Sequence, residues 1–308
     1  MDRSPSAPRP AFTLIELLLV IAIVAVLVSL TLPALRGVRE AARMTQSLSN
    51  NRSLWVATMA YREDNRQWLP IRFNKPGSVA VWASWFFGGK HCDAGWADRT
   101  FGLYDLAPPQ RPLNKYAVPE RTFTDRPTLR DPPVEPGVRA QEQAEMFRSP
   151  GDRVTYQGQN APFPTADPTR SSYDDVGTSY HMNIKWLGPV TSLMTAKWRE
   201  ARSGPSGGVE KAYAAEGNRR FMLADQFASG RMIFLYDQTA DVVANDSQRR
   251  DWMGEFGDVN KAVVTYIGGS SQYIKITPGE AQTRDYQFHL TLPEDAAYTP
   301  GATGASGP

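Results

Sequence analysis

The feature that most constrains this chain is an apolar run close to its amino terminus. From Leu17 to Leu35 the sequence holds 19 residues without a charged side chain. A helix of about 18–20 apolar residues is long enough to cross the hydrocarbon core of a membrane. The residues before Phe12 are polar and carry Arg3 and Arg9, which predicts that this end stays in the cytoplasm and that the rest is exported.

A carboxylate, Glu16, stands at the head of this run, and three explanations compete for the whole segment. A cleaved secretory signal has a shorter apolar core, of about 7–15 residues, and a small-residue cleavage site, whereas Leu32 stands two positions before Ala34. A plain membrane anchor fits the length but gives no reason for the acid. A carboxylate within a span costs about 2.5–3.5 kcal/mol at the bilayer centre, so it indicates a function. The alternative left open is that Glu16 lies among the headgroups and only ends the span.

The residues AFTLIEL, from Ala11 to Leu17, resemble the amino-terminal signal of type IV prepilins and type II secretion pseudopilins. In that family a prepilin peptidase cuts before the phenylalanine and methylates the new amino terminus. The resemblance implies cleavage between Ala11 and Phe12, Glu16 at the fifth mature position, and a helix-bending proline at Pro33. It also implies that Glu16 pairs with the Phe12 amine of a neighbouring subunit, an ion pair that sets the register between subunits.

The same resemblance implies a function, a location and partners. The function is that of a structural subunit of a secretion pseudopilus or pilus-like filament, without enzymatic activity. The chain would lie in the inner membrane as a single-pass protein with its C-terminal domain in the periplasm. Its partners would be prepilin peptidase, other pilin or pseudopilin subunits and the secretion assembly platform. A net charge of +2 gives no general attraction to nucleic acid.

Helical spacing continues beyond the membrane segment. Apolar or small side chains recur at steps of three, four or seven, at Leu35, Val38, Ala42, Thr45, Leu48, Trp55 and Met59. We therefore expect one helix from Thr13 to about Asn65, kinked at Pro33. The chain then divides into a leader (1–11), a membrane segment (12–35), an extramembrane part of the helix (36–66), a globular domain (67–292) and a flexible tail (293–308).

The globular region predicts an α+β fold, in which the long helix packs on a C-terminal antiparallel sheet. Aromatic residues cluster among glycines between 68 and 104, and eight prolines between 105 and 136 predict a long irregular connection. Alternating apolar and polar residues predict half-buried strands. Strands are expected at 220–225, 231–236, 262–267, 272–276 and 286–292. Three segments resemble large prepilin-like proteins of planctomycete-type bacteria: 147–152, 178–183 and a hairpin at 263–270.

Candidate chemical sites are few. Three scattered histidines and Cys92 do not provide the clustered ligands of a zinc site. His91 and Cys92 are chain neighbours beside glycines that suggest a surface turn, so they do not predict a nucleophile and its base. We expect no cofactor, although acidic residues at 174–175 and between 237 and 246 leave calcium open. The alternative function is a signal-anchored periplasmic domain that binds a ligand or acts as an enzyme.

Overall fold

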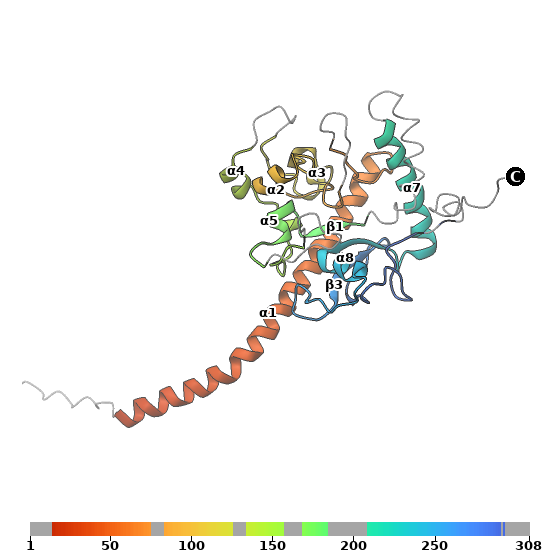
Figure 1. Cartoon of the computed structure of the whole chain (residues 1–308). Helices are drawn as coiled ribbons and strands as arrows, with labels where there is room; N and C mark the ends of the chain where they lie inside the picture. Colours follow the sequence, from red (N-terminus) through yellow and green to blue (C-terminus); the bar gives the residue numbers. More distant parts are fainter. Residues whose placement is uncertain are drawn as a thin grey trace, which may run out of the picture. The chain divides into compact units, whose positions relative to one another are not determined.

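A computed structural model of the chain describes residues 14–74, 83–125, 134–156, 168–183, 208–290 and 292, with the side chains of 33, 34 and 208–214 left out. The chain forms two compact units, Met1–Ala42 and Arg43–Pro308, which are described separately. The helices are α1 (Leu14–Asp64), α2 (Ala94–Arg99), α3 (Asn114–Ala117), α4 (Pro136–Gln141), α5 (Ser172–Val176), α7 (Gly208–Ala228) and α8 (Gln238–Asn245), with short 3-10 turns at Pro108–Gln110 and Glu145–Phe147 (Figure 1).

The first unit consists of the amino-terminal part of α1. The helix begins at Leu14 and continues through position 33, and its end at Asp64 lies one residue from the predicted end. Each side chain from Leu14 to Leu32 is exposed, and the helix is long and apolar enough to cross a membrane. The predicted cleavage site at Ala11 and Phe12 lies outside the described residues, as does the side chain of Pro33. Cleavage and the kink therefore remain predictions.

The second unit is built around a four-stranded antiparallel sheet in the order β1–β2–β3–β4. Its strands are β1 (Tyr180–Met182), β2 (Ile233–Asp237), β3 (Lys261–Tyr266) and β4 (Ser271–Lys275). Strands β3 and β4 form the predicted hairpin, in which Val263 pairs with Tyr273. The predicted strands at 231–236, 262–267 and 272–276 are thus confirmed, and the fold is α+β.

The two central strands are buried on both faces, whereas half-buried strands were expected. All five residues of β2 are buried, and only the edge strand β4 shows the exposed positions of a half-buried strand. Helix α8 packs against β2 and β3. Phe234 and Leu235 of β2 belong to one apolar cluster with Leu54 of α1 and Phe221 of α7. Because helices and connections cover both faces, the central strands read as apolar runs without alternation.

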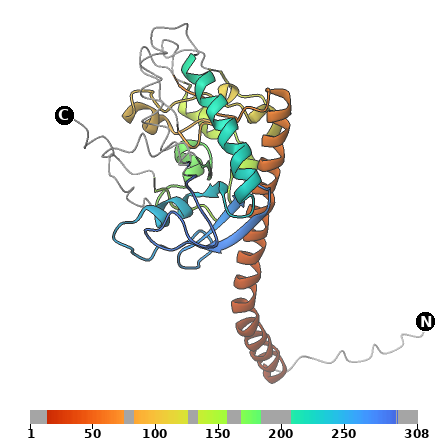
Figure 2. The ribbon, with the colours of Figure 1, turned by 90° about the vertical axis from the view of Figure 1, so that its right-hand side faces the viewer.

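Helix α7 replaces one predicted strand. Residues 220–225 were expected to be extended, but they lie inside α7, which runs beside the carboxyl-terminal part of α1 in both views (Figures 1 and 2). The guanidinium of Arg62 on α1 lies 3.8 Å from the ring centroid of Phe221 and donates to the side chain of Asn218. The buried positions Phe221 and Ala224 follow helical spacing, which a window of six residues does not separate from a strand.

The predicted strand at 286–292 is also wrong over its described part. Tyr286 and Phe288 are buried as the pattern indicated, but the backbone forms only isolated bridges, one from Gln287 to Met232 and one to Gln282. The predicted apolar stripe of α1 is displaced as well. Its first four members, from Leu35 to Thr45, are exposed. The face that the domain buries instead carries Ser47, Asn51, Leu54, Thr58 and Arg62.

Hydrogen bonds explain how α1 can bury so polar a face. The hydroxyl of Ser47 lies 3.0 Å from that of Tyr180 on β1, and the hydroxyl of Thr58 donates to the carbonyl of Leu54. The guanidinium of Arg62 donates to the carbonyl of Gln67 just beyond the helix. Buried polar groups are tolerated when they find such partners, and hydropathy alone does not show which of them will.

Candidate functional sites in the helix and the globular unit

The first candidate site is the amino-terminal turn of α1. Glu16 lies in this turn, and its exposed apolar neighbours are Leu14, Ile15 and Leu17. A carboxylate at this end of a helix is favoured by the partial positive charge of the unpaired backbone N–H groups. The turn therefore presents one acid among exposed apolar side chains.

The second candidate site was not found by sequence reasoning. It is a group of three carboxylates, Asp152, Asp237 and Glu255, which come from three separate segments of the chain. Asp237 ends β2 and begins α8, where its two oxygens accept hydrogen bonds from the backbone N–H groups of Ala240 (3.3 Å) and Val263 (2.6 Å). The sequence pattern predicted only the strand that ends there, and no spacing rule links the three acids.

Asp152 is held as firmly as Asp237. One of its oxygens accepts from the backbone N–H of Ser172 at 2.9 Å, and the other accepts from the N–H of Tyr173 at 2.9 Å and the hydroxyl of Ser179 at 2.6 Å. This contact joins two of the segments singled out in the sequence, 147–152 and 178–183. Glu255 differs, because its hydrogen bond comes from the side-chain hydroxyl of Ser149.

Burial and mutual repulsion keep these acids weak. Burial raises the pKa of Asp152 to about 6 and that of Asp237 to about 7. The charge of Asp174 adds to the effect on Asp152, and the charge of Asp152 adds to the effect on Asp237. Burial, followed by the charges of Asp237 and Asp152, raises the pKa of Glu255 well above its ordinary value. The hydroxyl of Ser149 acts in the opposite direction but does not outweigh them. Ionisation of Glu255 therefore lowers the free energy of unfolding.

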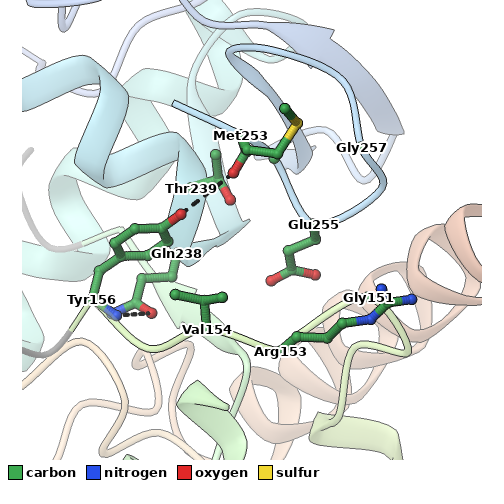
Figure 3. Close-up of a pocket in the computed structure, with 10 residues that line it drawn as sticks. Gly151, Arg153, Val154, Tyr156, Gln238, Thr239, Met253, Glu255 and Gly257 are labelled. Atoms are coloured by element: carbon green, nitrogen blue, oxygen red, sulfur yellow. Dashed lines mark hydrogen bonds between the residues drawn. The ribbon is translucent and has the colours of Figure 1, made fainter. Parts of the chain in front are cut away.

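A cavity of about 230 Å³ opens beside Glu255. The carboxylate of Glu255 points into it from the loop that follows Met253 (Figure 3). The backbone N–H of Tyr156 donates to the side chain of Gln238 at 3.0 Å, and the Tyr156 hydroxyl donates to the carbonyl of Met253 at 3.3 Å. These bonds tie together the three segments that form the wall. The lining residues are Gly151, Arg153, Val154, Tyr156, Gln238, Thr239, Met253, Gly254, Glu255 and Gly257.

Replacing Glu255 with glutamine tests the charge balance of this site. Because the pKa of Glu255 is raised in the folded state, its ionisation opposes folding as the pH rises above the ordinary pKa of a glutamate. We expect Glu255→Gln to raise the melting temperature at pH 8, with a gain that shrinks as the pH falls and vanishes below about pH 4, where the unfolded chain is protonated as well. Differential scanning calorimetry at several pH values measures this. The matched control is Asp258→Asn, which changes an exposed acid nearby.

The segment around Cys92 is buried, so the expected surface turn is wrong. Cys92 and His91 are each about 1% exposed. The ring of His91 lies 3.0 Å from Glu142, and burial with the charge of Arg139 lowers its pKa to about 4. Burial raises the pKa of the Cys92 thiol, whose sulfur donates to Asp105. A neutral thiol enclosed in this way is a poor nucleophile.

The acids considered for calcium have other partners. Asp174 pairs with Lys90 at 2.8 Å, and Asp246 binds Arg250 at 2.8 Å. Asp241 accepts from the side chain of Asn245. Within the described part of the chain, no group of three or more His, Cys, Asp or Glu side chains could hold a metal ion. These acids therefore act in capping and ion pairing.

Comparisons with known proteins add no family assignment. No family model matches the chain, and neither the curated proteins nor the solved structures contain a match.

Proposed function

We propose that this chain is a structural subunit of a pilus-like filament, of the pseudopilin type, that enters the filament through α1. The observation that carries the proposal is the apolar first part of α1 with Glu16 in its first turn. In the same proposal prepilin peptidase cuts between Ala11 and Phe12, and the globular unit lies in the periplasm while the helix spans the inner membrane. A start at Phe12, after loss of the leader, would place an ammonium four residues before Glu16.

The physical reason for assembly is the cost of a charge in lipid. A carboxylate in lipid loses hydration, and an ammonium on a neighbouring subunit compensates its charge. The pair forms only when the two helices stand at one axial offset, so it fixes the register of subunits. The apolar faces of neighbouring helices then pack by van der Waals contact.

Mass spectrometry of the amino terminus tests this function most directly. We expect the protein isolated from cells that contain prepilin peptidase to begin at Phe12 and to carry one N-methyl group. The same chain expressed in cells without the peptidase should retain Met1 and its leader. A start at Met1 in cells with the peptidase, or a start after Ala34 in either, would contradict the proposal.

A second function is favoured by one observation, the cavity beside Glu255. In this alternative α1 is only an anchor, and the exported unit binds a ligand in the cavity. An intact leader together with ligand binding would favour this second function. Processing at Phe12 with an essential Glu16 would favour the first, and the two properties can also coexist in one subunit.

A further inference from the structure

The three carboxylates are not equivalent, and the difference identifies the one that can meet a ligand. Both oxygens of Asp237 accept from backbone N–H groups, and both oxygens of Asp152 accept from backbone or hydroxyl donors. These acids hold the fold together. Glu255 accepts from Ser149 and directs its carboxylate into the cavity (Figure 3). The charges of Asp237 and Asp152 raise the pKa of Glu255.

Most of the cavity wall is apolar, and Gln238 and Thr239 contribute polar groups beside this acid. Val154 and Met253 contribute aliphatic surface, and the ring of Tyr156 is supported by Trp252 in an edge-to-face contact at 5.4 Å. The hydroxyl proton of Tyr156 is already donated to the backbone of Met253. Arg153 also lines the cavity, but its guanidinium extends away from Val154 and Tyr156 (Figure 3).

We propose that this cavity binds an unbranched primary alkylammonium group, with its nitrogen at the Glu255 carboxylate and its carbon stem against Val154, Tyr156 and Met253. A carboxylate beside aliphatic and aromatic walls matches a cation on an apolar stem (Figure 3). The volume of about 230 Å³ is several times the roughly 30 Å³ that one water takes in the liquid, so a four-carbon amine fits. Calcium fits poorly, since it takes six to eight oxygen ligands.

The ligand chemistry has two sources, a free small amine or a lysine side chain on another polypeptide. Both present the same ammonium on a four- or five-carbon stem. The proposal does not rest on the filament function, because Glu255 takes no part in processing at Phe12. A lysine of a neighbouring subunit would, however, make the cavity a lateral contact between subunits.

Binding of the ammonium is linked to the ionisation of Glu255. Asp152, Asp237 and burial favour the neutral acid, and a bound cation favours the carboxylate. Binding below the folded-state pKa of Glu255 therefore releases a proton, and affinity rises with pH until this acid is ionised. An alkylammonium stays charged up to about pH 9, because the pKa of such an amine is about 10.

Isothermal titration calorimetry on the full chain in detergent tests the site, with n-butylammonium and n-butanol as probes. We expect saturable binding of n-butylammonium at pH 8, at least tenfold weaker binding of n-butanol, and weaker binding of the amine at pH 6. Glu255→Gln should lower the affinity for n-butylammonium at least tenfold, and Asp258→Asn should leave it unchanged. Thermal melting of each variant checks that it is folded.

The two sources are separated by a lysine blocked at both its amino and carboxyl ends. Binding of the blocked lysine with the affinity of n-butylammonium supports a polypeptide ligand, and binding of n-butylammonium alone supports a free amine. The proposal is overturned if n-butanol binds as well as the amine, if folded Glu255→Gln binds the amine as the parent does, or if no binding is seen up to about 20 mM. Each of these results is independent of whether the leader is cleaved.

Discussion

Replacing Arg111 with methionine should destabilise the globular unit by about 3 kcal/mol, the largest loss of stability that we expect from a single substitution here. The side chain of Arg111 is about 1% exposed. Its guanidinium donates to the carbonyls of Leu106 at 3.0 Å, Gly88 at 2.9 Å and Val176 at 3.2 Å. Burial lowers its pKa to about 10, so the side chain stays charged at neutral pH.

Stability is lost because the substitution leaves buried carbonyl groups without a hydrogen-bond donor. Each buried polar group left without a partner costs about 1–3 kcal/mol, and removing a buried charge offsets part of the sum. The three carbonyls lie in segments that have little regular structure of their own: the turns after Ala83, the connection before Pro108 and the end of α5. The guanidinium joins these segments, so methionine of similar length fills the space but cannot replace the bonds.

Urea unfolding followed by tryptophan fluorescence measures the effect, with Arg121→Met as the matched control. Arg121 is exposed, and its replacement should change the free energy of unfolding by less than about 0.5 kcal/mol. Arg111→Lys keeps the charge but loses the planar fork, so it should be intermediate at best. A loss below about 1 kcal/mol in Arg111→Met would show that the carbonyls find other donors or water.

The sequence predicted the parts of the fold that depend on local pattern. The long helix follows from its apolar run and spacing, and strand β4 follows from its alternation. The hairpin that β4 forms with β3 was expected from a resemblance at 263–270. Its edge strand β4 keeps exposed positions, so alternation was informative there. The short strand β1 was missed, because three buried residues give no period to count.

The parts that the sequence did not predict depend on contacts between distant segments. Residues 220–225 show an apolar pattern that fits a strand or a helix. The helix is favoured by the packing of Phe221 against Arg62 of α1, a contact between distant segments. The polar buried face of α1 is another case, because the hydrogen bond between Ser47 and Tyr180 joins segments that lie far apart in the sequence. The cavity at Glu255 combines 151–156, 238–239 and 253–257, and no spacing rule connects them.

Glu16→Gln should leave membrane insertion intact but reduce incorporation into filaments at least tenfold, if the proposed function is correct. Glutamine has nearly the same size and keeps a hydrogen-bonding end, but it cannot form an ion pair with an ammonium. An uncompensated charge in the bilayer costs about 2.5–3.5 kcal/mol at the centre, and a tenfold effect corresponds to about 1.4 kcal/mol. The expected loss therefore holds even when Glu16 lies closer to the edge of the span.

The experiment compares the amount of protein in the membrane with the amount in sheared filaments, by immunoblot. The matched control is Glu63→Gln, which neutralises an exposed acid near the other end of the same helix. Control and parent should assemble equally, and all three proteins should be cleaved before Phe12, because Glu16 acts after processing. Normal assembly of Glu16→Gln would remove the main support for the filament, and it would leave an anchored exported domain whose remaining candidate site is the cavity at Glu255.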